Sequence, residues 1–232
     1  LNVAEQKKRT GHPFDQTYGL KALGLFRSQE EIDGWAIQDG RGNTSLKVGD
    51  IKYQDVNGDG TINSDDQIAI GYSTTAPEIY YSFHLGAEWK GLGIDAMFQG
   101  TANYSAILNT KAMFRPVLNS TNLSTYYYEN RWTEGNTNAR FPRLTSESNT
   151  NNYQTSTVWV VNRSFLKLRN LEVYYKLPKS LMQKAKFMNS AKVYVRGIDL
   201  LCFDGMDIVD PESYGVTNPL NKSVVIGLNI GF

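Results

Sequence analysis

Apolar and polar residues alternate strictly over residues 78–89. The odd positions hold apolar side chains such as Ile79 and Trp89, while the even positions are mostly polar or small. A period of two is the pattern of a β-strand with one apolar and one polar face. The alternation returns over residues 93–105, after a short glycine-containing turn at residues 90–93. The two stretches therefore predict a β-hairpin.

Three more alternating stretches follow in the second half of the chain, at residues 164–177, 190–203 and 222–232. A phase slip near Gly197 predicts a β-bulge in the second of these strands. Two long polar segments, residues 106–162 and 204–221, interrupt the strands. This layout divides the chain into a loop and strand region at residues 1–77 and a strand region at residues 78–232.

Three short helices are also expected. Ser28 followed by Glu31 at the third helical position is a capping signal, which predicts one or two helical turns. The aromatic run at residues 124–132 and the proline-led segment at residues 178–186 predict two more.

Strands with one apolar face leave two alternatives open, a soluble β-sandwich and a transmembrane barrel. The strand lengths are near the roughly 9–11 residues that cross a bilayer at a tilt. Trp89, Tyr104 and Tyr175 lie at strand ends, where the aromatic girdle of a barrel belongs, and short turns alternate with long loops. These features favour an all-β fold made of antiparallel strands of a large transmembrane β-barrel.

A barrel would place the polar face of the strands in an aqueous lumen. The expected lumen-facing residues are Glu88, Asp95, Gln99, Lys192 and Arg196. If the short turns are periplasmic, the long loops are extracellular and the C-terminus is periplasmic. Five strands cannot close around a lumen, so the chain is expected to be one part of a larger barrel.

Residues 55–66 read D-x-N-x-D-G-x-I-x-x-x-D, which is the spacing of an EF-hand-type calcium loop. Oxygen ligands would come from Asp55, Asn57, Asp59, the Thr61 carbonyl, Asn63 and Asp66. Gly60 would permit the sharp turn, and Ile62 would point into the packing beneath the loop. The pattern predicts Ca²⁺, with Mg²⁺ as the alternative, in a loop expected to be extracellular.

Two other interpretations of this loop stay open. An Asn/Gly/Asp-rich surface turn that binds no metal has a similar composition, and a single dockerin-type repeat has a similar loop that continues into a helix. A regulatory EF-hand does not fit, because residues 47–53 are β-like and residues 67–72 are too short for a full helix.

Composition removes several classes of function. A formal net charge of +1 gives no reason to expect a polyanion partner, so no nucleic acid is predicted. The single cysteine, Cys202, excludes an internal disulfide, and no run approaches the roughly 20 apolar residues of a membrane helix. His12 and His84 lie far apart in sequence, and no nucleophile and base are paired, so we expect no enzyme. The acidic residues Asp204, Asp207, Asp210 and Glu212 are interpreted as a solvated loop.

The segments Gly49–Gly60, Lys90–Gly100, Asn130–Arg143, Phe165–Leu171, Leu177–Leu181 and Asp210–Glu212 together resemble the C-terminal third of SusC-like TonB-dependent outer-membrane transporters of Bacteroidetes. The resemblance covers nearly the whole chain. It implies a barrel of about 22 strands around an internal plug. The partners it implies are a SusD-like surface lipoprotein as lid, TonB in the periplasm, the remainder of the barrel and plug, and outer-membrane lipid.

The family imports glycans or peptides, and Phe232 resembles the barrel-assembly signal of its members. A plug and a TonB box are expected upstream of this sequence, so this fragment by itself is not expected to transport. Tyr126, Tyr127 and Trp132 are the expected contacts with a ligand or the lid, with packing inside the loop as the alternative.

A rival hypothesis is a secreted, calcium-stabilised β-domain that binds glycan through Trp132 and the tyrosines at residues 126–128. The two differ at the apolar face of the strands. A soluble domain must bury that face under a second sheet, whereas a barrel leaves it to lipid.

Overall fold

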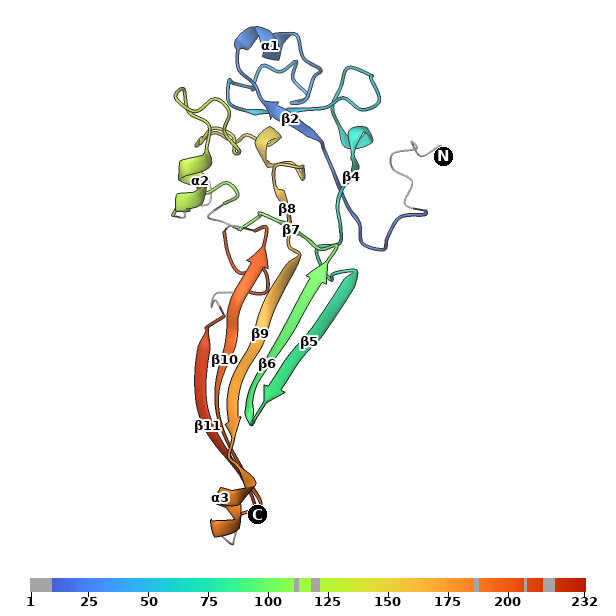
Figure 1. The fold of residues 1–232 in the computed structure, drawn as a ribbon. Coiled ribbons are helices and arrows are strands. Elements are labelled where there is room, and N and C mark those ends of the chain that lie inside the picture. Colours follow the sequence, from blue (N-terminus) through green and yellow to red (C-terminus); the bar gives the residue numbers. More distant parts are fainter. Residues whose placement is uncertain (1–9, 111–112, 118–121, 186–187, 207, 215–219) are drawn as a thin grey trace. The chain divides into compact units, whose positions relative to one another are not determined.

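The computed structural model describes residues 10–110, 113–117, 122–185, 188–206, 208–214 and 220–232 (Figure 1). The chain divides into two compact units, each assembled from two separate stretches. Unit 1 comprises Leu1–Ala76 and Tyr104–Asn162, and unit 2 comprises Pro77–Asn103 and Arg163–Phe232. The long segment at residues 106–162, expected as a loop between strands, thus packs with the region that precedes residue 77.

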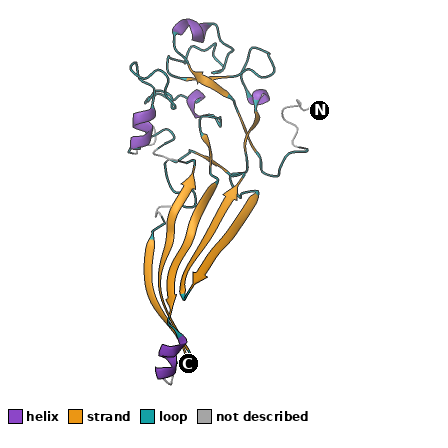
Figure 2. Ribbon diagram, viewed as in Figure 1, coloured by secondary structure: helices purple, strands orange, loops and turns teal. Residues whose placement is uncertain are grey.

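Unit 2 is one five-stranded antiparallel sheet, with its strands side by side in Figures 1 and 2. The strand order is β11-β10-β9-β6-β5. Their bounds are β5 (Ile79–Trp89), β6 (Leu92–Ala102), β9 (Phe165–Lys176), β10 (Ser190–Asp204) and β11 (Ser223–Gly231). All five lie within a few residues of the alternating stretches in the sequence, because each period-two run supplies the apolar face that its strand needs.

The turn between β5 and β6 is shorter than expected. Trp89 pairs directly with Leu92, so only Lys90 and Gly91 form the turn. Both have positive φ, 50° and 87°. A two-residue hairpin turn of this kind matches the right-handed twist of the strands, and glycine adopts positive φ without steric cost.

The register of the sheet separates apolar and polar side chains onto opposite faces. One rung across all five strands contains Ala87, Ile94, Val173, Val195 and Ile226. The next rung contains Gly86, Asp95, Glu172, Arg196 and Val225. Because side chains alternate in direction along a strand, the first rung belongs to the apolar face and the second to the polar face.

The polar face is also shaped by tyrosines that cover glycines on neighbouring strands. A Cβ placed on Gly93 would lie 2.1 Å from the Tyr174 ring, and one on Gly227 would lie 2.2 Å from the Tyr194 ring. Any larger residue at either glycine would displace the ring. This pairing of glycine with an aromatic side chain holds neighbouring strands in register.

Two irregular features interrupt the long strands. The bulge expected near Gly197 lies between Ile198 and Leu201, where the pairing of β10 with β9 shifts. The helix expected at residues 178–186 is α3 (Lys179–Ala185), which follows Pro178 and joins β9 to β10.

Unit 1 contains short strands in two-stranded pairs. β1 (Thr17–Gly19) pairs with β4 (Ile68–Gly71), β2 (Ala22–Leu25) with β3 (Ile51–Tyr53), and β7 (Ser105–Ile107) with β8 (Val160–Asn162). None of these pairs was expected from the sequence, because strands of three or four residues are too short to display a period.

The helices of unit 1 are short. Ser28 caps α1 (Gln29–Asp33), as expected, with its Oγ accepting a hydrogen bond from the Glu31 amide. The helix expected at residues 124–132 is α2 (Thr125–Asn130). The described residues of unit 1 also include two 3-10 turns, η2 (Ser64–Asp66) and η3 (Asn151–Tyr153).

Aromatic and aliphatic side chains fill two parts of unit 1. Phe26, Ile32 and Leu46 form one buried cluster. Phe141 and Trp159 are fully buried and stack with ring centroids 5.6 Å apart. These contacts add to the apolar burial of the short strands, where Ile51 and Tyr53 are also fully buried.

The all-β fold class is confirmed, with antiparallel strands as its main elements and only short helices between them. Within the described residues, no helix has the length and apolar character that a membrane-spanning helix requires.

Candidate functional site

The five residues expected to face a lumen lie on one face of the sheet. Asp95 and Arg196 each pair in register with Glu172, and Lys192 pairs with Lys176. Gln99 pairs with Lys167 and Glu88 with Gly93, at even intervals along the same face. The register places these side chains on the same face of the sheet. Their exposure to a lumen stays a prediction.

Charges on this face are paired across strands. Glu172 Oε1 lies 2.7 Å from Lys192 Nζ, and Glu172 Oε2 accepts from the Arg196 guanidinium with an Nε to Oε2 distance of 2.9 Å. Glu172 is 7% exposed, so its carboxylate depends on these two cations for compensation. Asp95 pairs in register with Glu172, so two acids and two bases lie together at this point of the face.

Two further acids on the face have partners on other strands: those of Glu88 on β5 lie on β9, across β6, and that of Asp95 on β6 lies on β5. Glu88 accepts hydrogen bonds from Tyr174 Oη at 2.8 Å and Lys176 Nζ at 2.6 Å. Asp95 Oδ1 lies 2.5 Å from His84 Nε2. An open hollow of about 660 Å³ lies over this part of the face. Its lining includes Ser82, His84, Asp95, Asn170, Glu172 and Arg196. These side chains offer both hydrogen-bond donors and acceptors to a polar solute.

At the end of the sheet near the 204–221 segment, five charged residues form an ion-pair cluster. Lys167 Nζ lies 2.6 Å from Asp210 Oδ2 and 2.7 Å from Glu212 Oε2. Arg169 pairs with Glu212 and, at 2.8 Å, with Asp199 Oδ1. Lys167 is only 2% exposed. The cluster therefore ties the loop that carries Asp210 and Glu212 to the polar face of β9 and β10.

This cluster corrects the interpretation of the acidic segment as a solvated loop. Burial raises the pKa of the Asp210 carboxyl, but the hydrogen bonds from Lys167 and the backbone amides outweigh it, so the pKa lies below its ordinary value of 3.8. Burial likewise raises the pKa of Glu212, and Arg169 and Lys167 bring it below 4.5. Both acids are therefore charged at neutral pH. Asp204 accepts from the Met206 amide, while Asp207 lies outside the described residues.

The predicted calcium loop closes on itself through Asx-type hydrogen bonds. Asp55 Oδ1 accepts from the Gly58 amide at 2.7 Å, and its Oδ2 accepts from the Gly60 amide at 2.8 Å. Asn57 Oδ1 accepts from the Asp59 amide at 3.0 Å. Asn63 Oδ1 accepts from the Asp65 amide at 2.6 Å. The tight turn expected of the motif is thus present.

Asp66 closes this loop from beneath. Its side chain is fully buried, with Oδ1 accepting from the Val56 amide and Oδ2 from the Asn63 amide, both at 2.8 Å. Ile62 is 7% exposed, which confirms that it packs beneath the loop. Among the described residues, no three or more His, Cys, Asp or Glu side chains gather closely enough to hold a metal ion. The oxygen donors of the loop have the chemistry of a calcium site, and metal binding stays a prediction.

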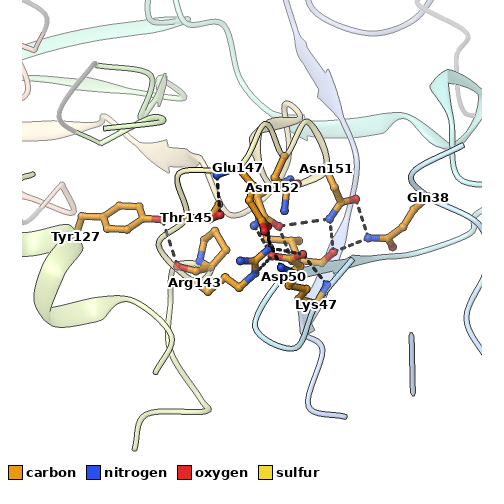
Figure 3. Close-up of polar contacts among 12 residues, drawn as sticks. Gln38, Lys47, Asp50, Tyr127, Arg143, Thr145, Glu147, Asn151 and Asn152 are labelled. Atoms are coloured by element: carbon orange, nitrogen blue, oxygen red, sulfur yellow. Dashed lines mark hydrogen bonds and ion pairs between the residues drawn. The ribbon is translucent and has the colours of Figure 1, made fainter. Parts of the chain in front are cut away.

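A buried polar network lies at the centre of unit 1 (Figure 3). Asp50 is fully buried, and its Oδ1 accepts from Arg143 Nε at 2.7 Å and from Asn152 Nδ2 at 2.8 Å. The Lys47 amide donates to Asp50 Oδ2 at 2.9 Å. Both carboxylate oxygens are therefore hydrogen-bonded, as a buried carboxylate requires. The network fastens the 47–53 segment to residues 143–152, about a hundred positions away in sequence.

The three aromatic residues expected at a ligand or lid surface have different environments. Tyr127 is fully buried and stacks on Phe141 with centroids 5.0 Å apart, so it belongs to the core and cannot contact a ligand. Burial raises its pKa well above the ordinary value. Trp132 packs over Gly49, where a Cβ would lie 2.4 Å from the indole. Tyr126 is partly exposed, and its hydroxyl accepts a hydrogen bond from Arg140 at 2.7 Å.

Sequence reasoning missed both charged networks. Lys167 and Arg169 stand on a strand without a local partner, and Asp50 looks like a turn residue. The signal that could have revealed the first is the pair of cations two residues apart on the same face of an otherwise amphipathic strand. Such cations need anions when they are buried.

Comparison with known proteins finds similarity to TonB-dependent receptors. The chain is 29% identical over 230 residues to TonB-dependent receptor P26 of Formosa agariphila, and 26% identical over 232 residues to TonB-dependent receptor P3 of the same organism. These matches cover 92% and 100% of the chain. The chain spans 22% of the length of each relative. No family model matches it.

Solved structures agree with the sequence comparison. The RagAB peptide transporter superposes with a TM-score of 0.65 at 25% identity, over 94% of this chain and 22% of that chain. The RagAB peptide importer in its closed-closed state gives a TM-score of 0.64 at 27% identity, over 94% of this chain and 23% of that chain. Sequence and structure together confirm the resemblance of this chain to the C-terminal part of the SusC-like TonB-dependent outer-membrane transporters of Bacteroidetes.

Proposed function

We propose that this chain forms part of the barrel wall of a TonB-dependent outer-membrane transporter. The apolar face of unit 2 carries the argument. Val224, Ile226 and Leu228 are 70%, 76% and 58% exposed, and no second layer covers them within the described part of the chain. A continuous apolar surface of this kind on a sheet with long strands requires lipid or another apolar cover.

The opposite face supports the same proposal. Its charges are neutralised across strands, as at Glu172 and Glu88, and they border an open polar hollow. Side chains of this type suit an aqueous lumen, along which a polar solute passes. The transported solute is a glycan or a peptide, and the similarity to the RagAB peptide importer favours a peptide.

The partners follow from the same proposal. A SusD-like surface lipoprotein covers the long-loop end, and TonB acts from the periplasm through another part of the full protein. The short turns at residues 90–91 and 177–189 face the periplasm, as does Phe232, which follows β11 and is 79% exposed. The 55–66 loop is then extracellular.

Two observations argue against the rival proposal, a secreted glycan-binding domain. The uncovered apolar face would make such a domain aggregate. Tyr127, one of its candidate sugar contacts, is buried in the core.

Fractionation of the native source tests the membrane proposal. Membranes are washed with urea and probed with an antibody against residues 122–162. We expect the antigen to stay in the outer-membrane fraction, on a band much larger than 26.1 kDa. A soluble antigen of about this mass would contradict the proposal and favour the secreted domain.

We also propose that the 55–66 loop binds Ca²⁺, with Mg²⁺ as the alternative. The exposed oxygens of Asn57 and Asp59 and the half-buried Asp55 are the ligands available from the solvent side. Asp66 holds the two ends of the loop together beneath them. Hard oxygen donors on a glycine-containing turn are the ligand set that calcium prefers.

Terbium luminescence with the full-length protein tests this proposal. We expect terbium emission that Ca²⁺ displaces, and its loss in the Asp59→Asn variant. Asn109→Asp, which adds an acid in unit 1 away from the loop, is the control and should leave emission unchanged. Wild-type protein without calcium-sensitive emission would contradict calcium binding.

A further inference from the structure

Two hollows lie at the short-turn end of the sheet. The first, of about 480 Å³, is lined by Lys90, Lys176, Lys179 and Lys192 together with the apolar Tyr175 and Met182. No acidic residue lines it within the described part of the chain. The second, of about 370 Å³, is lined almost entirely by apolar side chains, including Trp89, Leu92, Ile94 and Val173. We call these the basic hollow and the apolar hollow.

The two hollows are neighbours on the sheet. Leu92 of the apolar hollow pairs in register with Tyr175 of the basic hollow. The Lys90 ammonium lies 4.5 Å from the centre of the Trp89 ring, so one cation stands at the border between them. A ligand with a charged end and an apolar end could therefore occupy both hollows at once.

The charge of the basic hollow is only partly compensated. Lys176 pairs with Glu88 at 2.6 Å, and Lys192 pairs with Glu172 at 2.7 Å. Glu172 also pairs with Arg196. Among the described residues, Lys90 and Lys179 form no ion pair. The basic hollow therefore keeps at least two uncompensated positive charges for an anionic group.

The volume of the basic hollow and the polarity of both hollows limit which ligand can bind. A volume of about 480 Å³ suits a small head group rather than a macromolecular surface. The apolar hollow lies on the face that we assign to lipid, with Trp89 71% exposed at its edge. Positive charge beside an aromatic residue at the end of a membrane strand is where anionic lipid phosphates lie.

We propose that the basic and apolar hollows together bind one anionic diacyl phospholipid. Its phosphate lies between Lys90 of the turn and Lys179 of α3, the two lysines of the basic hollow outside the strands, and one acyl chain lies along Trp89, Leu92 and Ile94. This inference rests on the proposed membrane function. It goes beyond that function by assigning a lipid site with head-group preference to the short-turn end of this wall.

Native mass spectrometry of the full-length protein in detergent tests the site. The protein is mixed with a phosphatidylglycerol or with a phosphatidylcholine of the same acyl chains. We expect preferential retention of phosphatidylglycerol, and a drop to the phosphatidylcholine level in the Lys90→Gln/Lys179→Gln variant. The expected loss is roughly fivefold for each lysine removed. Lys222→Gln, directly before β11 at the opposite end of the sheet, is the matched control and should retain the preference.

Two further measurements complete the test. One distinguishes a lipid phosphate from free phosphate, and the other distinguishes failure of the lipid site from failure of the membrane proposal. Inorganic phosphate at the same concentration should not displace phosphatidylglycerol, because it lacks the acyl chain; displacement would overturn the lipid assignment. Equal retention of the two lipids by wild-type protein, or an unchanged preference in the double variant, would also overturn it. Those results, obtained with protein that stays in urea-washed membranes, would leave the proposed function intact.

Discussion

Lys167 is a buried lysine whose ammonium contacts two carboxylates, Asp210 and Glu212. Removing one partner of such a pair is destabilising, because the remaining buried charge has lost its solvation and has no opposite charge to compensate for it. Arg169 shares Glu212, so the two cations hold the same loop segment. At the scale of single residues, this cluster attaches Asp210 and Glu212 to the sheet.

Replacing Lys167 with methionine should release that loop segment. The variant keeps most of the length of the side chain and removes its charge, leaving Asp210 without its cation and Glu212 with Arg169 alone. We expect a loss of local stability of about 2 kcal/mol, less than for a fully buried pair because the acids are partly exposed. Hydrogen exchange at the Glu212 and Ser213 amides, which both hydrogen-bond to Asp210, should accelerate roughly 30-fold.

Lys222→Met serves as the control for this variant, because Lys222 is exposed and lies outside the cluster. Unchanged exchange at both amides in Lys167→Met would show that the cluster does not hold the loop.

The same loop should respond to acid. The pKa values of Asp210 and Glu212 lie below their ordinary values of 3.8 and 4.5, so the folded state favours the charged forms. Their contribution to stability is then present above the ordinary pKa range and is lost as the pH falls through the lowered values. Exchange protection at Ser213, corrected for intrinsic rates, should hold from pH 7 to about pH 5 and decline below about pH 4. Protection that is equal at pH 3 and pH 6 would contradict these shifts.

At the scale of elements, the Asp50 network decides how unit 1 assembles. It joins the segment before β3 to the turn η3 through Asn152. Two pieces of chain, one before and one after the β5–β6 hairpin in the sequence, therefore share one set of buried hydrogen bonds. Ile51 and Tyr53 of β3 are fully buried, and the network adds directional hydrogen bonds that fix the position of the strand.

Asp50→Ala should destabilise unit 1 strongly. The substitution leaves the Arg143 guanidinium, 14% exposed, without its buried carboxylate partner and with only the exposed Glu147. Removal of one partner of a buried pair costs about 3–5 kcal/mol. We expect faster proteolysis within residues 122–162, while the five-stranded sheet of unit 2 keeps its protection. Glu147→Gln, which removes an exposed partner of the same arginine, is the control and should be cleaved no faster than wild type.

The elements themselves divide into those that a pattern could predict and those that it could not. Each long strand is indicated by its own run of alternating positions, and Ser28 and Gly197 mark a cap and a bulge through local chemistry. The strand pairs of unit 1 depend on contacts between distant segments, such as Ala22 with Thr157, 135 positions apart, which no local pattern contains. The burial of Tyr127 could not be predicted either, because a run of three tyrosines does not indicate which ring is buried.

At the scale of the whole molecule, the main feature is the five-stranded sheet, which has one apolar face and one polar face. The rung through Ile226 is apolar on every strand, and the adjacent rung through Asp95, Glu172 and Arg196 carries paired charge. Sequence alternation predicted the two faces, but the ion pairs on the polar one required the register of the strands. Both faces are needed for a wall between lipid and water.

Cysteine labelling at two adjacent positions of β11 tests this central claim most directly. Val225→Cys and Ile226→Cys are placed separately in a Cys202→Ser background, in the full-length protein in intact outer membranes. In the isolated chain Ile226 is the more exposed of the two, at 76% against 41%. If the apolar face contacts lipid, a water-soluble maleimide should label the Val225→Cys variant and leave the Ile226→Cys variant unlabelled until detergent extraction. Labelling of position 226 in intact membranes, at a rate equal to or above that of position 225, would contradict a lipid-facing wall.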